Sequence, residues 1–96
     1  MLTGKQKRYL RAAASLINPA AIVGKEGLTD EVIAEIRTGL EANELVKIKI
    51  GRNSPQEPSE VIAGLEVLAG VEVVQKIGRN IVLFKQKKRD SEFKLP

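Results

Sequence analysis

The sequence contains no cysteine and no histidine. Without cysteine the chain can form neither disulfides nor a thiolate metal site, and without histidine it lacks the commonest general base. Carboxylates remain, but those of Glu35, Glu41, Glu60 and Glu66 fall on the expected solvent-facing sides of helices. The composition gives no support to catalysis, so we expect a protein that is not an enzyme and uses no metal or cofactor.

Aromatic residues make up only 3% of the chain, as Tyr9, Phe84 and Phe93. The apolar share of 43% is that of a globular domain, so the core is expected to be aliphatic. Because rings that could stack on bases are scarce, we do not expect the chain to bind nucleic acid on an aromatic platform.

Long apolar runs are also absent. No segment approaches the roughly 18 apolar residues of a membrane-spanning helix, and the basic residues 1–11 lack the apolar centre of a secretory signal. We therefore expect one domain over residues 1–89, without a membrane partner and followed by a mobile tail, 90–96. The lack of cysteine fits a reducing cytoplasm, where we expect the protein to act as a monomer.

Positive charge is concentrated near the two ends of the sequence, and the net charge is +4. Residues 1–11 and 76–89 include basic side chains and no acidic one, whereas residues 26–72 are acidic on balance. This asymmetry favours an anionic partner, although lysines that merely solvate the ends of a small protein would look the same. The acidic middle, with Glu31, Glu35 and Glu41, would instead suit a basic protein partner.

Apolar periodicity predicts three helices and four strands. The helices are expected over about 4–17, 30–43 and 55–69, and the strands over 20–23, 44–50, 71–77 and 80–85. Thr3 and Thr29 are expected as N-caps, and Thr3 forms a capping box with Gln6. Ser54 is expected to cap the third helix, with Pro55 at its first position.

Two glycines mark the later turns. Gly70 is expected just after the end of the third helix, and Gly78-Arg79 fits a two-residue type II′ hairpin turn. The order α-β-α-β-α-β-β then predicts an α/β two-layer (α+β) fold with a mixed four-stranded sheet. Each β-α-β unit should join parallel strands, with the second and third helices on one face. The place of the first helix does not follow from the pattern.

The first helix is expected to have a core face and a basic face. The apolar positions at helical spacing are Leu2, Tyr9, Leu10, Ala13, Leu16 and Ile17. Lys7, Arg8 and Arg11 fall on the opposite side. In the second strand Lys47 and Lys49 alternate with apolar residues, which indicates a half-buried strand with a basic outer face.

A four-residue loop, Gly24-Lys25-Glu26-Gly27, joins the first strand to the second helix. Glycine lets a backbone approach a ligand closely, and KH domains clamp about four nucleotides of backbone with a loop of this pattern. Lys25 would meet a phosphate as a mobile charge, although Glu26 and the following acids oppose it. The alternative is a plain tight turn in which Gly27 has a positive φ.

Further basic residues could extend such a site. They are Arg8, Arg11, Lys47, Lys49, Lys76, Arg79 and Lys85. Each of them taken alone is more often a solvated surface charge than a ligand, and the sequence does not show whether they converge.

Four segments together resemble the CRM domain, named for chloroplast RNA splicing and ribosome maturation. They are residues 2–11, 23–29, 44–49 and 77–85, and the likeness spans about residues 2–89. The chain is similar to the stand-alone bacterial form, the YhbY-type RNA-binding protein. The resemblance implies a fold similar to the C-terminal domain of translation initiation factor 3.

The resemblance also implies a function. It implies binding to structured ribosomal RNA, association with the precursor of the large ribosomal subunit, and a role in ribosome assembly. The family's glycine loop corresponds to Gly24, Lys25, Glu26 and Gly27, where the acidic third position departs from the neutral polar residue common in relatives.

Overall fold

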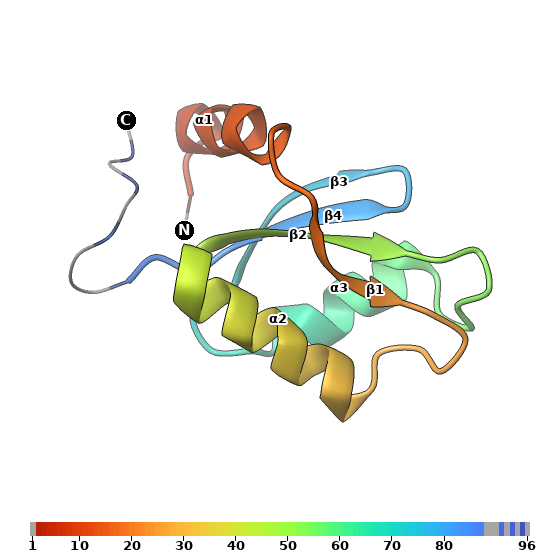
Figure 1. Cartoon of the computed structure of the whole chain (residues 1–96). Helices are drawn as coiled ribbons and strands as arrows, with labels where there is room; N and C mark the ends of the chain where they lie inside the picture. The colour runs from red at the N-terminus through yellow and green to blue at the C-terminus, as the bar shows by residue number, and fades with distance from the viewer. Residues whose placement is uncertain (1, 88–90, 92, 94, 96) are drawn as a thin grey trace.

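The computed structural model describes residues 2–87, 91, 93 and 95, and the described part has the expected order of elements. Figure 1 shows three helices and four strands. The helices are α1 (Gly4–Ala14), α2 (Asp30–Asn43) and α3 (Pro58–Glu66), and the strands are β1 (Pro19–Val23), β2 (Leu45–Ile50), β3 (Glu72–Ile77) and β4 (Asn80–Phe84).

The strands form a mixed sheet in the order β1-β2-β4-β3. β1 and β2 are parallel, whereas β4 is antiparallel to both β2 and β3. β3 therefore runs in the same direction as β2, as expected of a β-α-β unit, but the two strands are not paired. The closing hairpin returns the chain between them, and this makes β4 a central strand.

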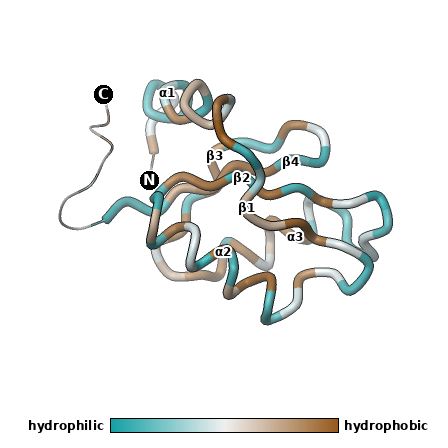
Figure 2. Tube along the Cα trace, viewed as in Figure 1, coloured by the Kyte–Doolittle hydropathy of each residue, from teal (hydrophilic) through white to brown (hydrophobic). Residues whose placement is uncertain are grey.

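The two faces of the sheet are covered differently (Figure 1). α2 and α3 pack on one face, as predicted, over an aliphatic cluster that includes Ile36, Ile48 and Leu83. α1 crosses the other face, where Leu10 belongs to a second cluster with residues of β2, β3 and β4. Figure 2 shows hydrophobic colouring along the central strands and mainly hydrophilic colouring at the loops. The two-layer α/β prediction is confirmed, and α1 adds partial cover to the second face.

The first helix is shorter than its apolar pattern predicts. The capping box of Thr3 with Gln6 is present, but the helix ends at Ala14 rather than near Ile17. Leu16 and Ile17 donate their N–H groups three residues back, a tighter turn than an α-helix. The expected apolar face was therefore wrong for Leu16, whose side chain is 88% exposed, and also for Tyr9, at 44%.

The third helix begins later than expected, at Pro58 rather than Pro55. Ser54 does not cap it, because its hydroxyl accepts from Gln56 N–H at 3.1 Å and donates to the Gln56 carbonyl at 2.9 Å. Pro58 takes the first helical position, where the missing N–H costs no hydrogen bond. The helix ends at Glu66, so Gly70, with φ of +76°, lies in the following turn and is not the residue that ends the helix.

The closing hairpin matches its prediction. Ile77 pairs with Asn80 across a two-residue turn, and Gly78 has φ of +57°. Arg79 lies outside the positive-φ region, which distinguishes a type II′ from a type I′ turn. β4 is buried on both faces, as its two-sided apolar pattern predicted.

The chain beyond β4 contacts the α1 side of the sheet. The Phe93 ring meets the buried Phe84 ring edge-on at a centroid distance of 5.5 Å. Glu44, fully buried with φ of 65°, accepts hydrogen bonds from Lys87 N–H at 3.0 Å and Ser91 Oγ at 2.6 Å. Of the tail expected to be mobile, 90–96, residues 90, 92, 94 and 96 lie outside the described residues.

No helix in the described part of the chain has the length and apolar character that a membrane crossing requires.

Candidate nucleic-acid interface

Two lysines project from the sheet face that α1 only partly covers. Along β2 the side chains alternate, so Leu45, Lys47 and Lys49 share the α1 side while Ile48 faces α2 and α3. Leu45 is buried beneath α1, Lys47 is half-buried and Lys49 is exposed. The expected basic outer face of this strand is confirmed. It begins at Lys47, after Leu45, the residue that α1 buries.

The helix α1 adds two cations beside this face. Leu10 and Ala14 form its buried stripe, and Lys7 and Arg11 flank that stripe one helical turn apart. Both are half-buried, whereas Arg8 is exposed. The expectation that all three basic residues lie opposite the core was therefore wrong for Lys7 and Arg11. A long basic side chain beside a buried stripe can cover apolar surface with its aliphatic stem while its charged end stays in water.

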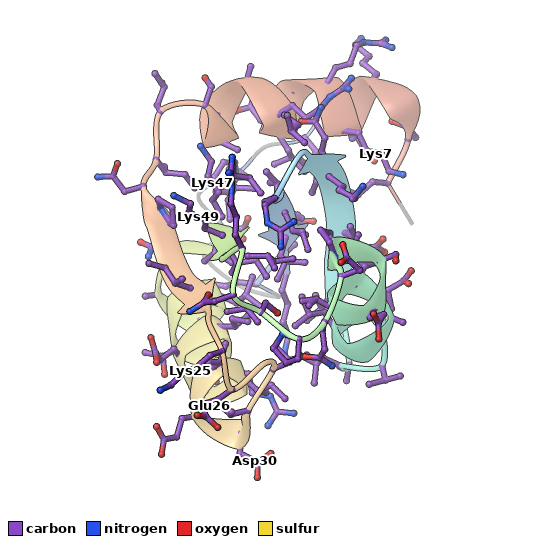
Figure 3. All side chains as sticks on the ribbon, turned by 90° about the vertical axis from the view of Figure 1, so that its right-hand side faces the viewer. Lys7, Lys25, Glu26, Asp30, Lys47 and Lys49 are labelled. Atoms are coloured by element: carbon purple, nitrogen blue, oxygen red, sulfur yellow. The ribbon has the colours of Figure 1, made fainter. Side chains whose placement is uncertain are left out.

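Two exposed isoleucines flank the lysines. Ile22 of β1 is 62% exposed and pairs with Lys49, and Ile77 of β3 is 57% exposed and pairs with Asn80. Figure 3 shows Lys47 and Lys49 below α1 and Lys7 on that helix. We define the α1–sheet surface as the half-buried and exposed cations of this face together with its two exposed isoleucines: Lys7, Arg11, Ile22, Lys47, Lys49 and Ile77.

The cations of the α1–sheet surface form no ion pair within the described part of the chain. The charge of an unpaired surface cation can attract an external anion, because no salt bridge within the protein neutralises it. The two isoleucines that flank the lysines are too few to bind the core of a protein partner, but they suit the apolar edges of a sugar or base. The surface therefore fits a polyanion better than a small neutral ligand.

The glycine loop is a hydrogen-bonded turn. Gly27 N–H donates to the Gly24 carbonyl at 3.0 Å, and Lys25 and Glu26, between them, lie outside the positive-φ region, which fits a type I turn. Gly27 then has φ of +75°, as predicted for a tight turn. The amide N–H groups of Lys25 and Glu26 donate to no group in the described residues, so they remain open to a ligand.

The next amide of the loop is already used. Leu28 N–H donates to Gln56 Oε1 at 2.7 Å, and a Cβ on Gly27 would lie 2.8 Å from that oxygen. Thr29 caps α2 by accepting from Val32 N–H at 3.2 Å. The N–H groups of Leu28 and Val32 are therefore occupied by groups of the protein, and the open donors of the loop are those of its two central residues.

The charges around the glycine loop do not favour an anion by themselves. An open hollow of about 510 Å³ beside the loop is lined by one cation, Lys25, and two carboxylates, Glu26 and Glu31. Figure 3 shows Lys25, Glu26 and Asp30 together at the end of the molecule far from Lys47. The loop is therefore a separate element from the α1–sheet surface.

Four other expected site residues lie outside the α1–sheet surface, and the first of them is Arg8, which is exposed on α1. Arg79 donates from Nε and Nη2 to the carbonyls of Ile50 and Gly51, both at 3.0 Å, and ties the hairpin to the end of β2. Lys76 pairs with Ile81, whose side chain faces α2 and α3. Lys85 follows β4 at the end of the sheet away from the hairpin.

Sequence reasoning missed two residues that the structure places at the candidate site. Lys7 has a usable signal, because it precedes Arg11 by four residues on a predicted helix. Gln56 has none, since its contact with Leu28 joins loops 28 residues apart. Within the described residues, no group of His, Cys, Asp or Glu side chains could hold a metal ion.

Comparison with known proteins agrees with the resemblance seen in the sequence. The model of the CRS1 / YhbY (CRM) domain family matches residues 2–85. The chain belongs to the CRM family. A "Probable RNA-binding protein YqeI" from Bacillus subtilis is 41% identical over the whole of both chains. An "RNA-binding protein" from Haemophilus influenzae is 32% identical, over 99% of this chain and 95% of its own.

A solved structure supports the fold of this CRM domain. The solution structure of SAV1595 from Staphylococcus aureus superposes with a TM-score of 0.82 at 40% sequence identity, and the alignment covers 100% of both chains. The predicted architecture, and the likeness to stand-alone bacterial members of the family, are therefore confirmed.

Proposed function

We propose that this CRM domain binds RNA, and that its RNA is ribosomal RNA in the precursor of the large ribosomal subunit. The observation that carries the proposal is the α1–sheet surface, in which Lys47 and Lys49 of β2 and Lys7 and Arg11 of α1 have no ion-pair partners among the described residues. Relatives at 41% and 32% identity are named RNA-binding proteins, which supports the same ligand class.

The proposed mechanism is mainly electrostatic. Lysines and arginines that neutralise phosphates release counterions, and this release supplies most of the affinity without reading sequence. With Tyr9, Phe84 and Phe93 as the sole aromatic residues, and Phe84 buried, base stacking contributes little. Specificity then comes from RNA shape, through the spacing of phosphates and 2′-hydroxyl groups.

The glycine loop has a secondary part in this mechanism. The open N–H groups of Lys25 and Glu26 would donate to a phosphate that approaches closely, and the Lys25 side chain would add one charge. The carboxylates around the loop weaken this contact. The glycine loop would therefore help to position the RNA backbone, and the α1–sheet surface would contribute most of the binding affinity.

A salt titration with charge-matched variants tests the proposal. Binding of a fluorescein-labelled RNA hairpin is measured at several salt concentrations for wild type, for Lys47→Ala/Lys49→Ala, and for the control Lys76→Ala/Lys85→Ala. The first variant should lower the log–log salt slope by about 1.4–1.8 units, from about 0.7–0.9 per lost phosphate contact. The control removes the same charge elsewhere and should keep the wild-type slope.

A flat salt dependence of the wild type would contradict the electrostatic mechanism. Equal slopes for the two variants would show that net charge matters but the α1–sheet surface does not. The ribosomal target, the cytoplasmic location and the monomeric state are tested by crosslinking in cells, sequencing of the bound RNA and sedimentation. We expect crosslinks to large-subunit precursor RNA; crosslinks spread evenly over messenger RNAs would contradict that target.

A second candidate function is docking on a basic ribosomal protein or assembly factor. Its support is the outer face of α2, where Glu31, Glu35 and Glu41 are exposed. Ribosome association that survives Lys47→Ala/Lys49→Ala but fails after Glu31→Lys/Glu35→Lys would favour this function over RNA binding.

A further inference from the structure

The loop between β2 and α3, residues 51–57, is joined by two hydrogen bonds to the residues on either side of the glycine loop. Gly51 N–H donates to the Val23 carbonyl at 2.8 Å, and Leu28 N–H donates to Gln56 Oε1 at 2.7 Å. Figure 1 shows the two loops at the same end of the sheet. The two loops therefore form one connected rim at that end of the sheet.

Gln56 is held from both sides of this rim. Its own N–H donates to Ser54 Oγ at 3.1 Å, and its side chain spans to the other loop at Leu28. Gly27 leaves the space that this contact needs, since a Cβ there would lie 2.8 Å from Gln56 Oε1. The position of the glycine loop thus depends on a side chain from the neighbouring loop.

The loop 51–57 contains a cation, Arg52, in addition to Lys25 of the glycine loop, and its one acidic residue is Glu57, the N-cap residue of α3. Arg52 and Asn53 are exposed, and Arg52 has no ion-pair partner among the described residues. From Gly51 to Gln56 the sequence contains no acidic residue. Arginine and asparagine side chains are common donors to phosphate oxygens. A cation on this side of the rim offsets the carboxylates on the other side.

We propose that loop 51–57 is a second RNA-contacting element, in which Arg52 binds a backbone phosphate and Gln56 is the positioning residue of the glycine loop. The inference rests on the proposed RNA-binding function. An RNA strand at this end of the sheet would meet Arg52 on one side and the open N–H groups of Lys25 and Glu26 on the other.

The contact role of Arg52 is tested against a matched arginine. Arg52→Ala and Arg37→Ala each remove one exposed charge, and Arg37 lies on α2, outside the rim. With the fluorescein-labelled RNA hairpin, Arg52→Ala should lower the log–log salt slope by about 0.7–0.9 units, and Arg37→Ala should keep the wild-type slope. Equal behaviour of the two variants would overturn the contact role. Folding is not at risk, because the Arg52 side chain makes no hydrogen bond within the described residues.

The positioning role of Gln56 needs a readout that separates loop order from charge. Gln56→Met keeps the length of the side chain but removes the acceptor for Leu28. Amide exchange at Leu28 should then accelerate, and RNA affinity should fall about two- to tenfold, the effect of one net hydrogen bond, at an unchanged salt slope. Faster exchange at Leu28 together with wild-type affinity for the RNA hairpin would show that Gln56 stabilises the turn but does not affect RNA binding. That result would overturn the positioning role.

Failure of this inference and failure of the proposed function give different results. If the wild type does not bind the RNA hairpin with a salt-dependent affinity, the proposed function fails, and this inference fails with it. If the wild type binds and Lys47→Ala/Lys49→Ala weakens binding, while Arg52→Ala and Gln56→Met bind like the wild type, only the second contact element is overturned.

Discussion

Gly27→Ala is the substitution for which the structure makes its sharpest prediction, because two independent costs meet at one position. Gly27 has φ of +75°, a conformation that L side chains rarely adopt. An alanine there costs about 1–2 kcal/mol of backbone strain. The new Cβ would also lie 2.8 Å from Gln56 Oε1, closer than a carbon and an oxygen can approach.

The second cost is the hydrogen bond that the displaced oxygen accepts. Gln56 Oε1 must move away from Leu28 N–H, to which it is bonded at 2.7 Å. A lost hydrogen bond of this kind costs about 0.5–1.5 kcal/mol. With the strain, Gly27→Ala should lower the free energy of unfolding by about 1.5–3.5 kcal/mol, which for a domain of this size lowers Tm by roughly 6–28 °C.

Gly24→Ala is the matched control. Gly24 belongs to the same loop, its φ is not positive, and a Cβ there would meet nothing within 4 Å. Urea unfolding of wild type and both variants should show a large loss for Gly27→Ala and a change within about 0.5 kcal/mol for Gly24→Ala. Equal midpoints for the two variants would refute the reasoning, since they would show that neither the strain nor the Gln56 contact is present.

Three further substitutions test other parts of the structure. Arg79→Ala removes two hydrogen bonds to carbonyls at the end of β2; it should lower the free energy of unfolding by about 1–3 kcal/mol and accelerate amide exchange in the hairpin, with the RNA salt slope unchanged. Leu10→Ala empties a fully buried position beneath α1 and should cost about 2–5 kcal/mol in urea unfolding; a cost below that range would show that α1 packs loosely. Glu44→Ala removes the acceptor of the Ser91 hydroxyl, so the NMR signals of the Phe93 ring should move towards their unfolded positions, and unchanged signals would show that Glu44 does not hold this segment.

Much of the candidate site was predictable because its signals are local. The alternation of Lys47 and Lys49 with apolar residues correctly placed both lysines on one face of β2. The paired glycines correctly indicated a tight turn with a positive φ at Gly27. A helical pattern alone, however, could not show that Lys7 and Arg11 lie beside the core, since that depends on which part of the sheet α1 covers.

The roles of other residues depend on contacts between distant segments. Arg79 was expected among the RNA-binding cations, but its guanidinium donates to carbonyls 28 and 29 residues away in sequence. Gln56 had no recognisable signal for the same reason. No pattern within one segment encodes such contacts, because they arise only when loops from different elements meet at one end of the sheet.

By itself, the sequence determined the order of the elements, two of the helix caps, the hairpin turn and the face of β2 that is basic, because each of these depends on residues within a few positions of one another. Only the tertiary structure decided that β4 lies between β2 and β3, that α1 covers the other face of the sheet, and that Lys25 lies far from Lys47. These features depend on how buried surfaces from separate segments pack together. The free energy of that packing arises from contacts between residues that are far apart in the sequence, so no local pattern encodes it.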